Sequence, residues 1–201
     1  MPLTIKLCLE TKIMNKKAAK GSFFCFFIKN YQMRKTILFG LLLFTMATLK
    51  AQESIEKTTT YFLIRHAEKV RENPTDKNPD LNERGFMRAE NWKKVLQHVS
   101  FDVIYSTNLN RTLNTAEPIA KKCNLEPIIY NPSKVDFDLF QTENEGKNVL
   151  IVGHSNTVPQ FVNGLIKQQK YLEMDDAEFS HLYIVTVIGN QVTDLILYQD
   201  F

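Results

Sequence analysis

The sequence predicts an α/β protein, a three-layer α/β/α sandwich built around a mostly parallel sheet. Apolar, β-branched segments alternate along the chain with segments whose apolar residues recur at steps of three and four, the order expected of strands and helices in βαβ units. One strand segment, residues 148–152 (NVLIV), is almost entirely apolar, which is typical of a strand covered by helices on both faces. With 44% hydrophobic and 23% charged residues over 201 positions, the chain is neither disordered nor a disulfide-stabilised mini-protein.

The first 51 residues differ in charge from the rest. They contain nine Lys and Arg and one acidic residue, a net charge of +8, whereas residues 52–201 have a net charge of −5. The acidic remainder gives no reason to expect nucleic-acid binding. Within the leader, Arg34 and Lys35 precede an apolar segment of 13 residues, 36–48, and Ala51 supplies a small residue for cleavage. This order is typical of a secretory signal peptide, and the apolar segment falls short of the roughly 20 residues that span a bilayer.

The leader therefore predicts the domain organisation. We expect residues 33–51 to be the signal peptide, 1–32 to be an extension upstream of the true start at Met33, 52–57 to be a linker and 58–201 to be the functional domain. The mature protein would be periplasmic or secreted and would keep no stable membrane anchor. Its one cysteine, Cys123, can form no internal disulfide, and its place in a helical segment predicts an ordinary packing role.

The elements of the domain follow from the same patterns. Strands are predicted over residues 58–64, 101–105, 127–130, 148–152, 182–188 and 192–198, and helices over 82–99, 109–123, 135–141 and 157–167. The apolar face of the first helix is predicted to consist of Phe86, Ala89, Trp92, Val95, Leu96 and Val99. Gly189 and Asn190, between the last two strands, predict a tight hairpin turn.

Polar side chains follow three of the predicted strands directly. Arg65 and His66 follow the first strand, the segment 106–111 follows the second, and His154 follows the NVLIV strand. Ligands of open α/β sheets bind beyond the carboxyl ends of the strands, so these side chains are expected to converge there. Arginine forks and a helix N-terminus near Asn156 suit a phosphoryl group, and a neutral histidine can attack phosphorus.

At these residues the chain resembles the histidine phosphatase (phosphoglycerate mutase-like) superfamily. Residues 63–68 (LIRHAE) look like its first-histidine signature, with Ala67 in place of the signature glycine. Residues 81–85 (LNERG), 105–116 (YSTNLNRTLNTA) and 152–156 (VGHSN) are similar to its later motifs and occur in the same order. The resemblance spans most of the mature chain, and four ordered segments are a far more specific signal than one.

The resemblance implies a metal-independent phosphomonoester hydrolase that acts on a small phosphorylated substrate without a cofactor. His66 would be the nucleophile that becomes phosphohistidine, Arg65 and Arg111 would bind the phosphate, and His154 would assist by hydrogen bonding to the phosphoryl oxygens. Asn156 would add a phosphate contact, although a helix cap is its more ordinary role.

The proton donor to the leaving group is left open. Asn156 stands where one branch of the superfamily has an aspartate donor, and an amide cannot replace it. Asp136 and Asp138 lie in the region from which another branch draws its acid, and Glu68 adjoins the nucleophile. A working acid needs a raised pKa and reach to the leaving oxygen, and the ordinary reading of both aspartates is that of solvated charges at a helix start.

Three other readings stay open from the sequence. The first is a non-catalytic phosphate- or polyanion-binding protein on the same fold, and the second is a phosphoglycerate mutase-like phosphotransferase. The third is a metallohydrolase that uses His66, Glu68 and His154, which the neighbouring arginines disfavour because they repel a cation. Lys69 and Arg71 could meet anionic groups of the substrate beyond the reacting phosphoryl, or could form a solvated loop surface.

Overall fold

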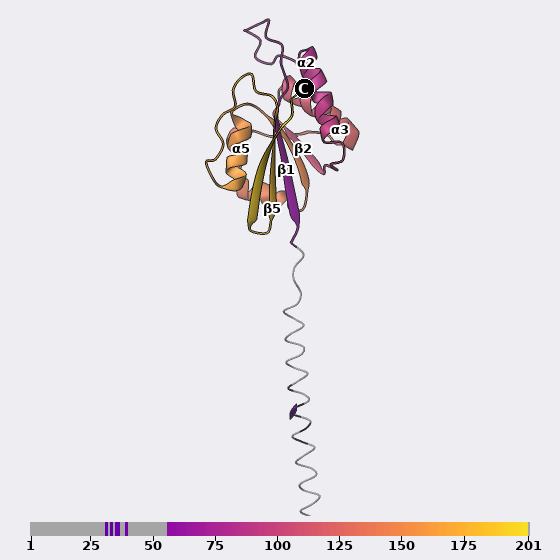
Figure 1. Cartoon of the computed structure of the whole chain (residues 1–201), viewed down its shortest axis with the longest axis vertical. Coiled ribbons are helices and arrows are strands. Elements are labelled where there is room, and N and C mark those ends of the chain that lie inside the picture. The colour runs from indigo at the N-terminus through magenta and orange to yellow at the C-terminus, as the bar shows by residue number, and fades with distance from the viewer. Residues whose placement is uncertain (1–30, 32, 34, 37–38, 40–55, 201) are drawn as a thin grey trace, which may run out of the picture. The chain divides into compact units, whose positions relative to one another are not determined.

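The computed structural model describes residues 56–200 together with Tyr31, Met33, Lys35, Thr36 and Phe39. The chain divides into two units, Met1–Ile55 and Glu56–Phe201, and the fold is that of the second unit (Figure 1). Most of the predicted extension, most of the signal peptide including its cleavage site, and most of the linker lie outside the described residues. Within the part that the structure describes, no helix is both long and apolar enough to cross a membrane.

A six-stranded sheet forms the centre of the domain, in the order β3-β2-β4-β1-β5-β6. The first four strands of that order are mutually parallel, and β5 and β6 continue the sheet in antiparallel pairing. The sheet is therefore mostly parallel, as predicted. The strands are β1 (Thr58–Arg65), β2 (Val103–Ser106), β3 (Ile128–Ile129), β4 (Asn148–Gly153), β5 (His181–Ile188) and β6 (Gln191–Tyr198).

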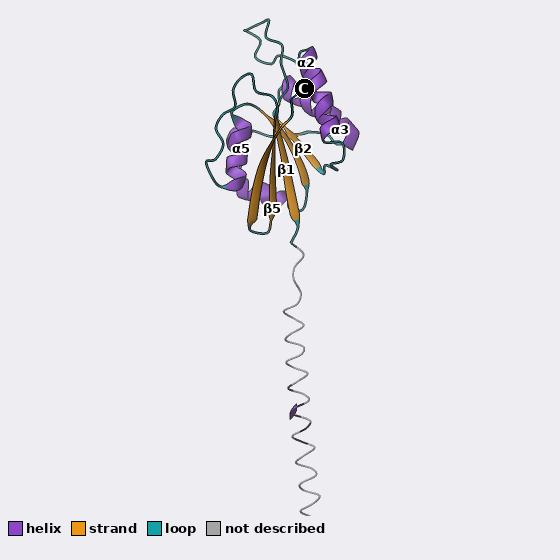
Figure 2. Cartoon of the chain, in the orientation of Figure 1, coloured by secondary structure: helices purple, strands orange, loops and turns teal. Residues whose placement is uncertain are grey.

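Helices cover both faces of the sheet, which makes the predicted three-layer sandwich (Figure 2). They are α2 (Glu83–Val95), α3 (Asn110–Cys123), α4 (Phe137–Glu143) and α5 (Thr157–Ile166), with a short 3-10 helix, η1, at Pro132–Lys134. Alternate residues of β1 point into two cores: Leu63 packs on the side of α4 and α5, and Ile64 packs on the side of α2 and α3. Burial on both faces explains why β4 is apolar over nearly its whole length.

The buried face of α2 differs from the predicted one. Trp92 is fully buried, as expected, but Phe86 and Val95 are 45% and 41% exposed, and Arg88 is 4% exposed. The helix also ends at Val95, four residues earlier than predicted. The spacing of apolar residues predicted the helix correctly but predicted the wrong buried face. Arg88 is buried because it pairs with a buried carboxylate, and the hydrophobicity pattern carries no information about that pairing.

The other elements keep their predicted order with shifted bounds. The helix predicted over 135–141 is α4, which begins two residues later, after η1. Pro118 lies inside α3 without ending it. The hairpin between β5 and β6 turns at Gly189, whose φ of +54° is a left-handed value that glycine adopts without strain.

Gly85 allows the start of α2 to lie against the segment after β1. A Cβ built at this position would stand 2.1 Å from the backbone oxygen of Glu68, so no larger residue fits without moving the backbone. Alanine normally favours a helix interior by about 1 kcal/mol over glycine, but the clash here acts in the opposite direction.

We therefore expect Gly85→Ala to lower the free energy of unfolding by about 2 to 4 kcal/mol, the range of overpacked sites. Urea denaturation followed by circular dichroism measures the change. Met87→Ala, at an exposed position of the same helix, should change stability by less than about 0.5 kcal/mol. A Gly85→Ala protein as stable as the wild type would contradict the close contact.

Candidate active site

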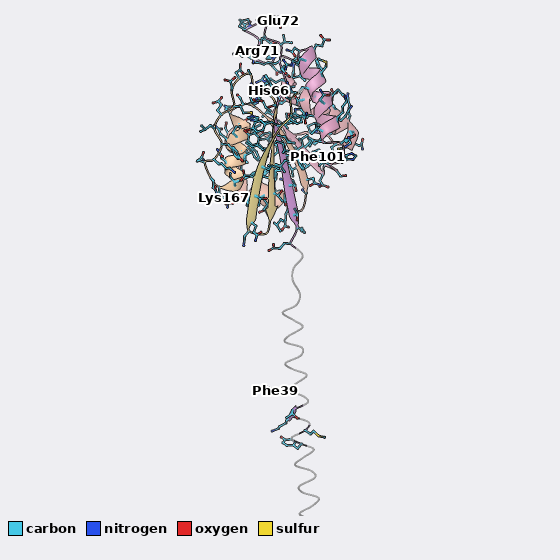
Figure 3. All side chains as sticks on the ribbon, in the orientation of Figure 1. Phe39, His66, Arg71, Glu72, Phe101 and Lys167 are labelled. Atoms are coloured by element: carbon cyan, nitrogen blue, oxygen red, sulfur yellow. The ribbon has the colours of Figure 1, made fainter. Side chains whose placement is uncertain are left out.

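The site lies at the carboxyl ends of three neighbouring parallel strands, β2, β4 and β1. Thr107 follows β2, His154 follows β4 and His66 follows β1. The backbone N–H of His66 donates to the oxygen of Gly153 at 2.9 Å, which continues the β1–β4 ladder to the two histidines. Figure 3 shows His66 at one end of the sheet, below the loop that carries Arg71 and Glu72. The predicted convergence of both histidines at the strand ends is what the structure shows.

His66 is held in the tautomer that leaves a lone pair on Nε2. Its Nδ1 lies 2.8 Å from the backbone oxygen of Ala67, and because a carbonyl only accepts, Nδ1 carries the proton. The side chain is buried, and burial together with the charges of His154, Arg111 and Arg65 lowers the pKa of His66 to about 3. The imidazole is therefore neutral at ordinary pH, which is the form that can act as a nucleophile.

His154 lies beside His66 with a ring-centroid separation of 5.3 Å. Its Nε2 is 3.0 Å from the hydroxyl of Thr107, and its backbone N–H donates to the hydroxyl of Thr157 at the start of α5. Burial, then the charges of Arg111, Arg65 and Lys69, lower the pKa of His154 to about 4. Both imidazoles are thus neutral in a cationic environment, an arrangement that suits an anionic ligand.

Arg65 is almost completely buried and is held by the segment before β5. Its Nη1 donates to the backbone oxygens of Asp175 and Glu178, both at 2.8 Å, and its Nη2 pairs with Asp176 at 3.0 Å. Its guanidinium also stacks over the ring of Phe179 at 4.3 Å. Its Nε is buried and has no hydrogen-bond partner among the described residues.

Arg111, in the first turn of α3, shows the same feature more strongly. Its Nε and Nη1 are both buried, and neither has a partner within the described part of the chain. Burial, and then the charge of Arg65, lower the pKa of its guanidinium. A buried charged donor without an acceptor costs on the order of 1 to 3 kcal/mol or more. Three such nitrogens beside two neutral histidines indicate a binding place for an anion.

Asn156 is exposed at the start of α5. Its side chain does not cap the helix, so the predicted capping interaction is absent, and the residue itself has helical backbone angles. The hydroxyl of Thr157 supplies the local side-chain bond instead. A phosphate contact from Asn156 stays a prediction.

Glu68 is the buried carboxylate that faces Arg88. Arg88 binds both of its oxygens, with distances of 2.7 to 3.1 Å, and Arg84 lies 3.1 Å from Oε1. Burial alone would raise the pKa of Glu68, but the hydrogen bonds and charges of these arginines outweigh it and lower the pKa below its usual value. A carboxylate that holds no proton at neutral pH has the contacts of a structural ion pair rather than those of a proton donor.

Asp136 and Asp138 make their contacts away from the histidines. Asp136 caps α4 by accepting from the backbone N–H of Leu139, and Asp138 pairs with Lys167 at 2.7 Å. Lys167 is the residue after α5, and His154 precedes that helix, which is about 15 Å long at 1.5 Å per residue. In Figure 3 the labelled Lys167 and His66 lie well apart. Both aspartates are thus charged residues at the start of α4, which is the non-catalytic role expected for them from the sequence.

Several side chains that shape the site were not singled out from the sequence. Thr107 contacts His154, and Thr115 accepts from the backbone N–H of Ala67 at 2.9 Å while donating to the oxygen of Arg111 at 2.6 Å. Thr115 therefore joins the loop of His66 to the turn of Arg111. Both threonines lie within the motif 105–116, so the sequence contained a signal that could have identified them. The segment 175–179 lies in no motif, so the sequence contained no such signal for it.

The described residues do not support the metallohydrolase reading. No group of three or more His, Cys, Asp and Glu side chains among them is placed to hold a metal ion. Of the three ligands that reading requires, Glu68 is engaged by two arginines.

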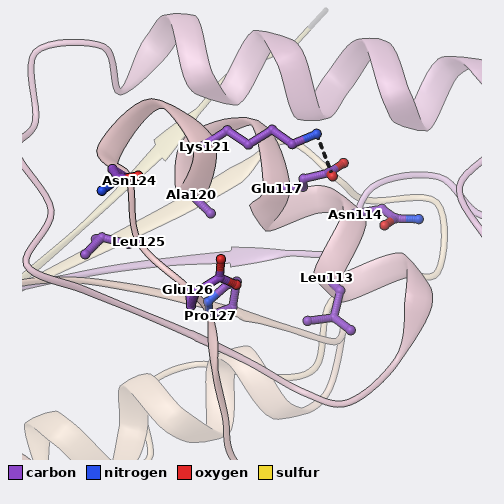
Figure 4. Close-up of a pocket in the computed structure, with 9 residues that line it drawn as sticks. All are labelled: Leu113, Asn114, Glu117, Ala120, Lys121, Asn124, Leu125, Glu126 and Pro127. Carbon is purple, nitrogen blue, oxygen red and sulfur yellow. Dashed lines mark ion pairs between the residues drawn. The ribbon is translucent and has the colours of Figure 1, made fainter.

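A hollow of about 640 Å³ lies along α3 and the turn after it (Figure 4). Its charged side chains include Lys121 and Glu117, which pair with one another at 2.7 Å. It contains none of the residues around the histidines, and we assign it no chemistry.

Fold and site together define an α/β protein in which two neutral histidines lie beside unpartnered arginine nitrogens, an arrangement suited to an anion. The family model of the histidine phosphatase superfamily (branch 1) matches residues 61–133, which include His66 and Arg111. This match agrees with the resemblance that the four motifs indicated. A search of curated proteins gave no significant match.

Several solved structures share the fold at low sequence identity. They include the protein histidine phosphatase SixA complexed with tungstate, which is 20% identical, with 69% of this chain and 96% of that chain covered and a TM-score of 0.52. Phosphoserine phosphatase from Entamoeba histolytica is 18% identical, with coverages of 71% and 98% and a TM-score of 0.52. Phosphoglycerate mutase from Bacillus anthracis is 15% identical, with coverages of 74% and 96% and a TM-score of 0.53.

The lowered pKa of His66 makes stability depend on pH. The unfolded chain binds a proton at this histidine near pH 6.5 and the folded chain only near pH 3, so the free energy of unfolding falls as pH drops below about 6.5. At pH 4.5 we expect His66 alone to have lowered the free energy of unfolding by about 2 to 3 kcal/mol relative to pH 7.5. His66→Asn keeps a donor for the oxygen of Ala67 but does not titrate, so its stability should fall less over this range. Urea midpoints at several pH values measure the difference, and parallel curves for the two proteins would contradict it.

Proposed function

We propose that this chain is a phosphomonoester hydrolase that forms a phosphohistidine at His66 and acts on a small phosphorylated substrate. The observation that carries the proposal is the set of three buried guanidinium nitrogens, on Arg65 and Arg111, that face no acceptor beside two neutral histidines. A phosphoryl group supplies the oxygens that such donors need.

The chemistry follows from the positions of the groups. The Nε2 lone pair of His66 attacks phosphorus, a P–N bond forms, and the P–O bond to the leaving group breaks with its electron pair. Arg65, Arg111 and His154 stabilise the charge that spreads over the equatorial oxygens. Water then attacks the phosphohistidine, the P–N bond breaks, inorganic phosphate leaves, and His66 recovers its lone pair.

The leaving oxygen needs a proton or must depart as a stable anion. Since Glu68 is held ionised by Arg88 and Arg84, water is the available donor. This route favours leaving groups that are themselves acidic, such as p-nitrophenol. Proton donation by water also distinguishes hydrolysis at this site from phosphoryl transfer to an alcohol, because such a transfer depends on a strong general acid.

One alternative has an observation in its favour. A non-catalytic anion-binding protein on this fold would use the same arginines and would have no need of a proton donor, consistent with the ionised Glu68. The neutral Nε2 of His66 argues for catalysis, because a site built only for binding gains more from a charged imidazole.

Hydrolysis of p-nitrophenyl phosphate by the purified protein tests the proposal. We expect turnover that resists a chelator and is abolished in His66→Ala, and a kcat/KM lowered about 100-fold or more in Arg111→Met, since loss of one oxyanion donor typically costs 10²- to 10³-fold. Lys121→Met, which removes a cation that lies on the outer side of α3, is the matched control and should hydrolyse the substrate as the wild type does.

Three outcomes would contradict the proposal. Turnover that survives in His66→Ala would exclude the phosphohistidine. Turnover lost on adding chelator would favour a metal-dependent reaction. Binding of phosphate without turnover at any pH from acidic to neutral would favour the non-catalytic alternative.

We also propose that the protein is exported to the periplasm or beyond it. The basic, apolar and small-residue order of residues 33–51 supports this proposal. Expressed in its native host, the exported protein should begin at Gln52, which N-terminal peptide mapping detects. A cytoplasmic protein that retains residues 33–51 would overturn it.

A further inference from the structure

We propose that two copies of this chain pair through β6, so that their six-stranded sheets join into one continuous sheet. The two β6 strands run antiparallel, and Leu195 of one copy lies opposite Leu195 of the second copy. This inference concerns one edge of the sheet and does not rest on the proposed function.

The two edges of the sheet differ in how they are protected. The edge strand β3 has two residues, whereas β6, at the other edge, has eight and pairs with β5 in an unbroken register. Proteins usually protect a long edge strand with a lysine, a proline, a bulge or a covering segment. β6 contains no lysine and no proline, and its one charged residue, Asp194, pairs with Lys170 at 2.6 Å. An unprotected edge of this length can accept another strand.

The backbone groups along the outer edge of β6 are available for that pairing. In an antiparallel pair, residues that bond to the neighbouring strand alternate with residues whose N–H and C=O point away from it. Gln199 N–H donates to the oxygen of Ser180 at 2.9 Å, and this bond, with the register, assigns the odd-numbered residues of β6 to β5. The even-numbered residues from 192 to 198 therefore direct their N–H and C=O groups outward. No other described segment of the chain pairs with this edge.

β6 also exposes apolar side chains on both of its faces. Leu195 lies opposite Ile184, which packs on the side of α2 and α3, and Leu195 and Leu197 are both exposed on this face. On the other face, Val192 and Tyr198 are exposed. Four of the eight side chains are thus apolar and accessible to solvent, so a strand added at this edge would gain apolar contacts as well as backbone hydrogen bonds.

The sequence of β6 is complementary to a second copy of itself. A twofold axis perpendicular to the sheet keeps each face of one copy on the same face of the other, so two odd-numbered or two even-numbered residues must lie opposite one another. Two registers of this kind pair seven residues of the strand. One of them places Asp194 opposite Asp194 of the second copy, and like charges directly opposite are destabilising. The other places Leu195 on the axis and is the register that we infer.

This register gives each exposed apolar side chain of β6 a neighbour across the axis. Leu195 meets its own counterpart, Val192 meets Tyr198 of the second copy, and Leu197 meets Thr193 of the second copy. A β-branched residue opposite an aromatic one is a favourable cross-strand pair. The four outward residues of each copy exchange eight backbone hydrogen bonds, close to the roughly ten of a typical specific interface.

The pairing leaves the histidine site of each copy separate. β6 is parallel to β1, because both strands are antiparallel to β5. The second copy reverses the strand direction, so the carboxyl ends of the two β1 strands lie at opposite ends of the joined sheet. β5 and β6 also separate β1 from the junction in each copy. We therefore expect any turnover per chain to be the same in the dimer and in a dissociated variant.

Sedimentation velocity of the purified protein over a concentration series tests the pairing. We expect a dimer for the wild type. Leu195→Lys places two lysines opposite one another and removes two leucines from the interface, so it should raise the dissociation constant about 100-fold or more. Thr193→Lys should also weaken the dimer, because an edge lysine opposes strand pairing. Thr193 is exposed, so this variant keeps the test valid if Leu195→Lys does not fold.

Leu139→Lys is the matched control. Leu139 lies on α4 and is 55% exposed, against 53% for Leu195, so the same substitution adds the same charge at a similarly accessible leucine outside β6. The control should remain a dimer with the dissociation constant of the wild type. Thermal melts followed by circular dichroism show whether each variant is folded.

Disulfide cross-linking tests the register. Leu195 and its counterpart would form a non-hydrogen-bonded pair, whose Cα atoms lie about 4.5 Å apart, within the range that a disulfide spans. The background is the chain in which Cys8, Cys25 and Cys123 are replaced by alanine. In this background we expect Leu195→Cys to form a disulfide-linked dimer on mild oxidation and Leu139→Cys to remain uncross-linked.

Three outcomes would overturn the proposal. The first is a protein that is monomeric at every concentration. The second is a dimer that both Leu195→Lys and Thr193→Lys leave intact, which would locate the association outside β6. The third is a dimer that cross-links through Asp194→Cys and not through Leu195→Cys, which would contradict the inferred pairing.

Discussion

The buried ion pair between Glu68 and Arg88 is the interaction on which the position of His66 depends. It joins the segment after β1 to α2, and the close contact at Gly85 and the bond from Asn82 N–H reinforce the same junction. On its other side the segment is fixed to α3 through Thr115. The loop of His66 is thus held between two helices, and a buried charge pair of this kind is costly to break once formed. Such rigidity is what a nucleophile needs if its reacting nitrogen is to stay aimed.

The second constraint is electrostatic. Burial, together with the positive charges of two guanidiniums, keeps both histidines neutral. Three buried guanidinium nitrogens have no acceptor among the described residues. A phosphoryl group, the ligand that we propose, would provide acceptors for these donors and an electrophile for the lone pair of His66.

Much of this arrangement could be predicted from the sequence. Strand order along the chain, the NVLIV strand and the polar residues at strand ends predicted the sandwich and the meeting of His66 with His154, because periodicity and chain direction determine both. The buried face of α2 was predicted wrongly, since the burial of Arg88 depends on a partner 20 residues away. The engagement of Arg65 by residues 175–178 could not be predicted either, because backbone carbonyls carry no sequence signal.

That engagement has a consequence for how the site comes into being. Arg65 lies at the end of the first strand, but its guanidinium is oriented by carbonyls that arrive more than 100 positions later in the chain. The family match ends at residue 133, before this segment begins. During synthesis the histidine motif is therefore made long before the backbone that orients its arginine. The arrangement of Arg65 can be complete only when the last third of the chain has docked onto the sheet, so the presence of the motif does not by itself report a finished site.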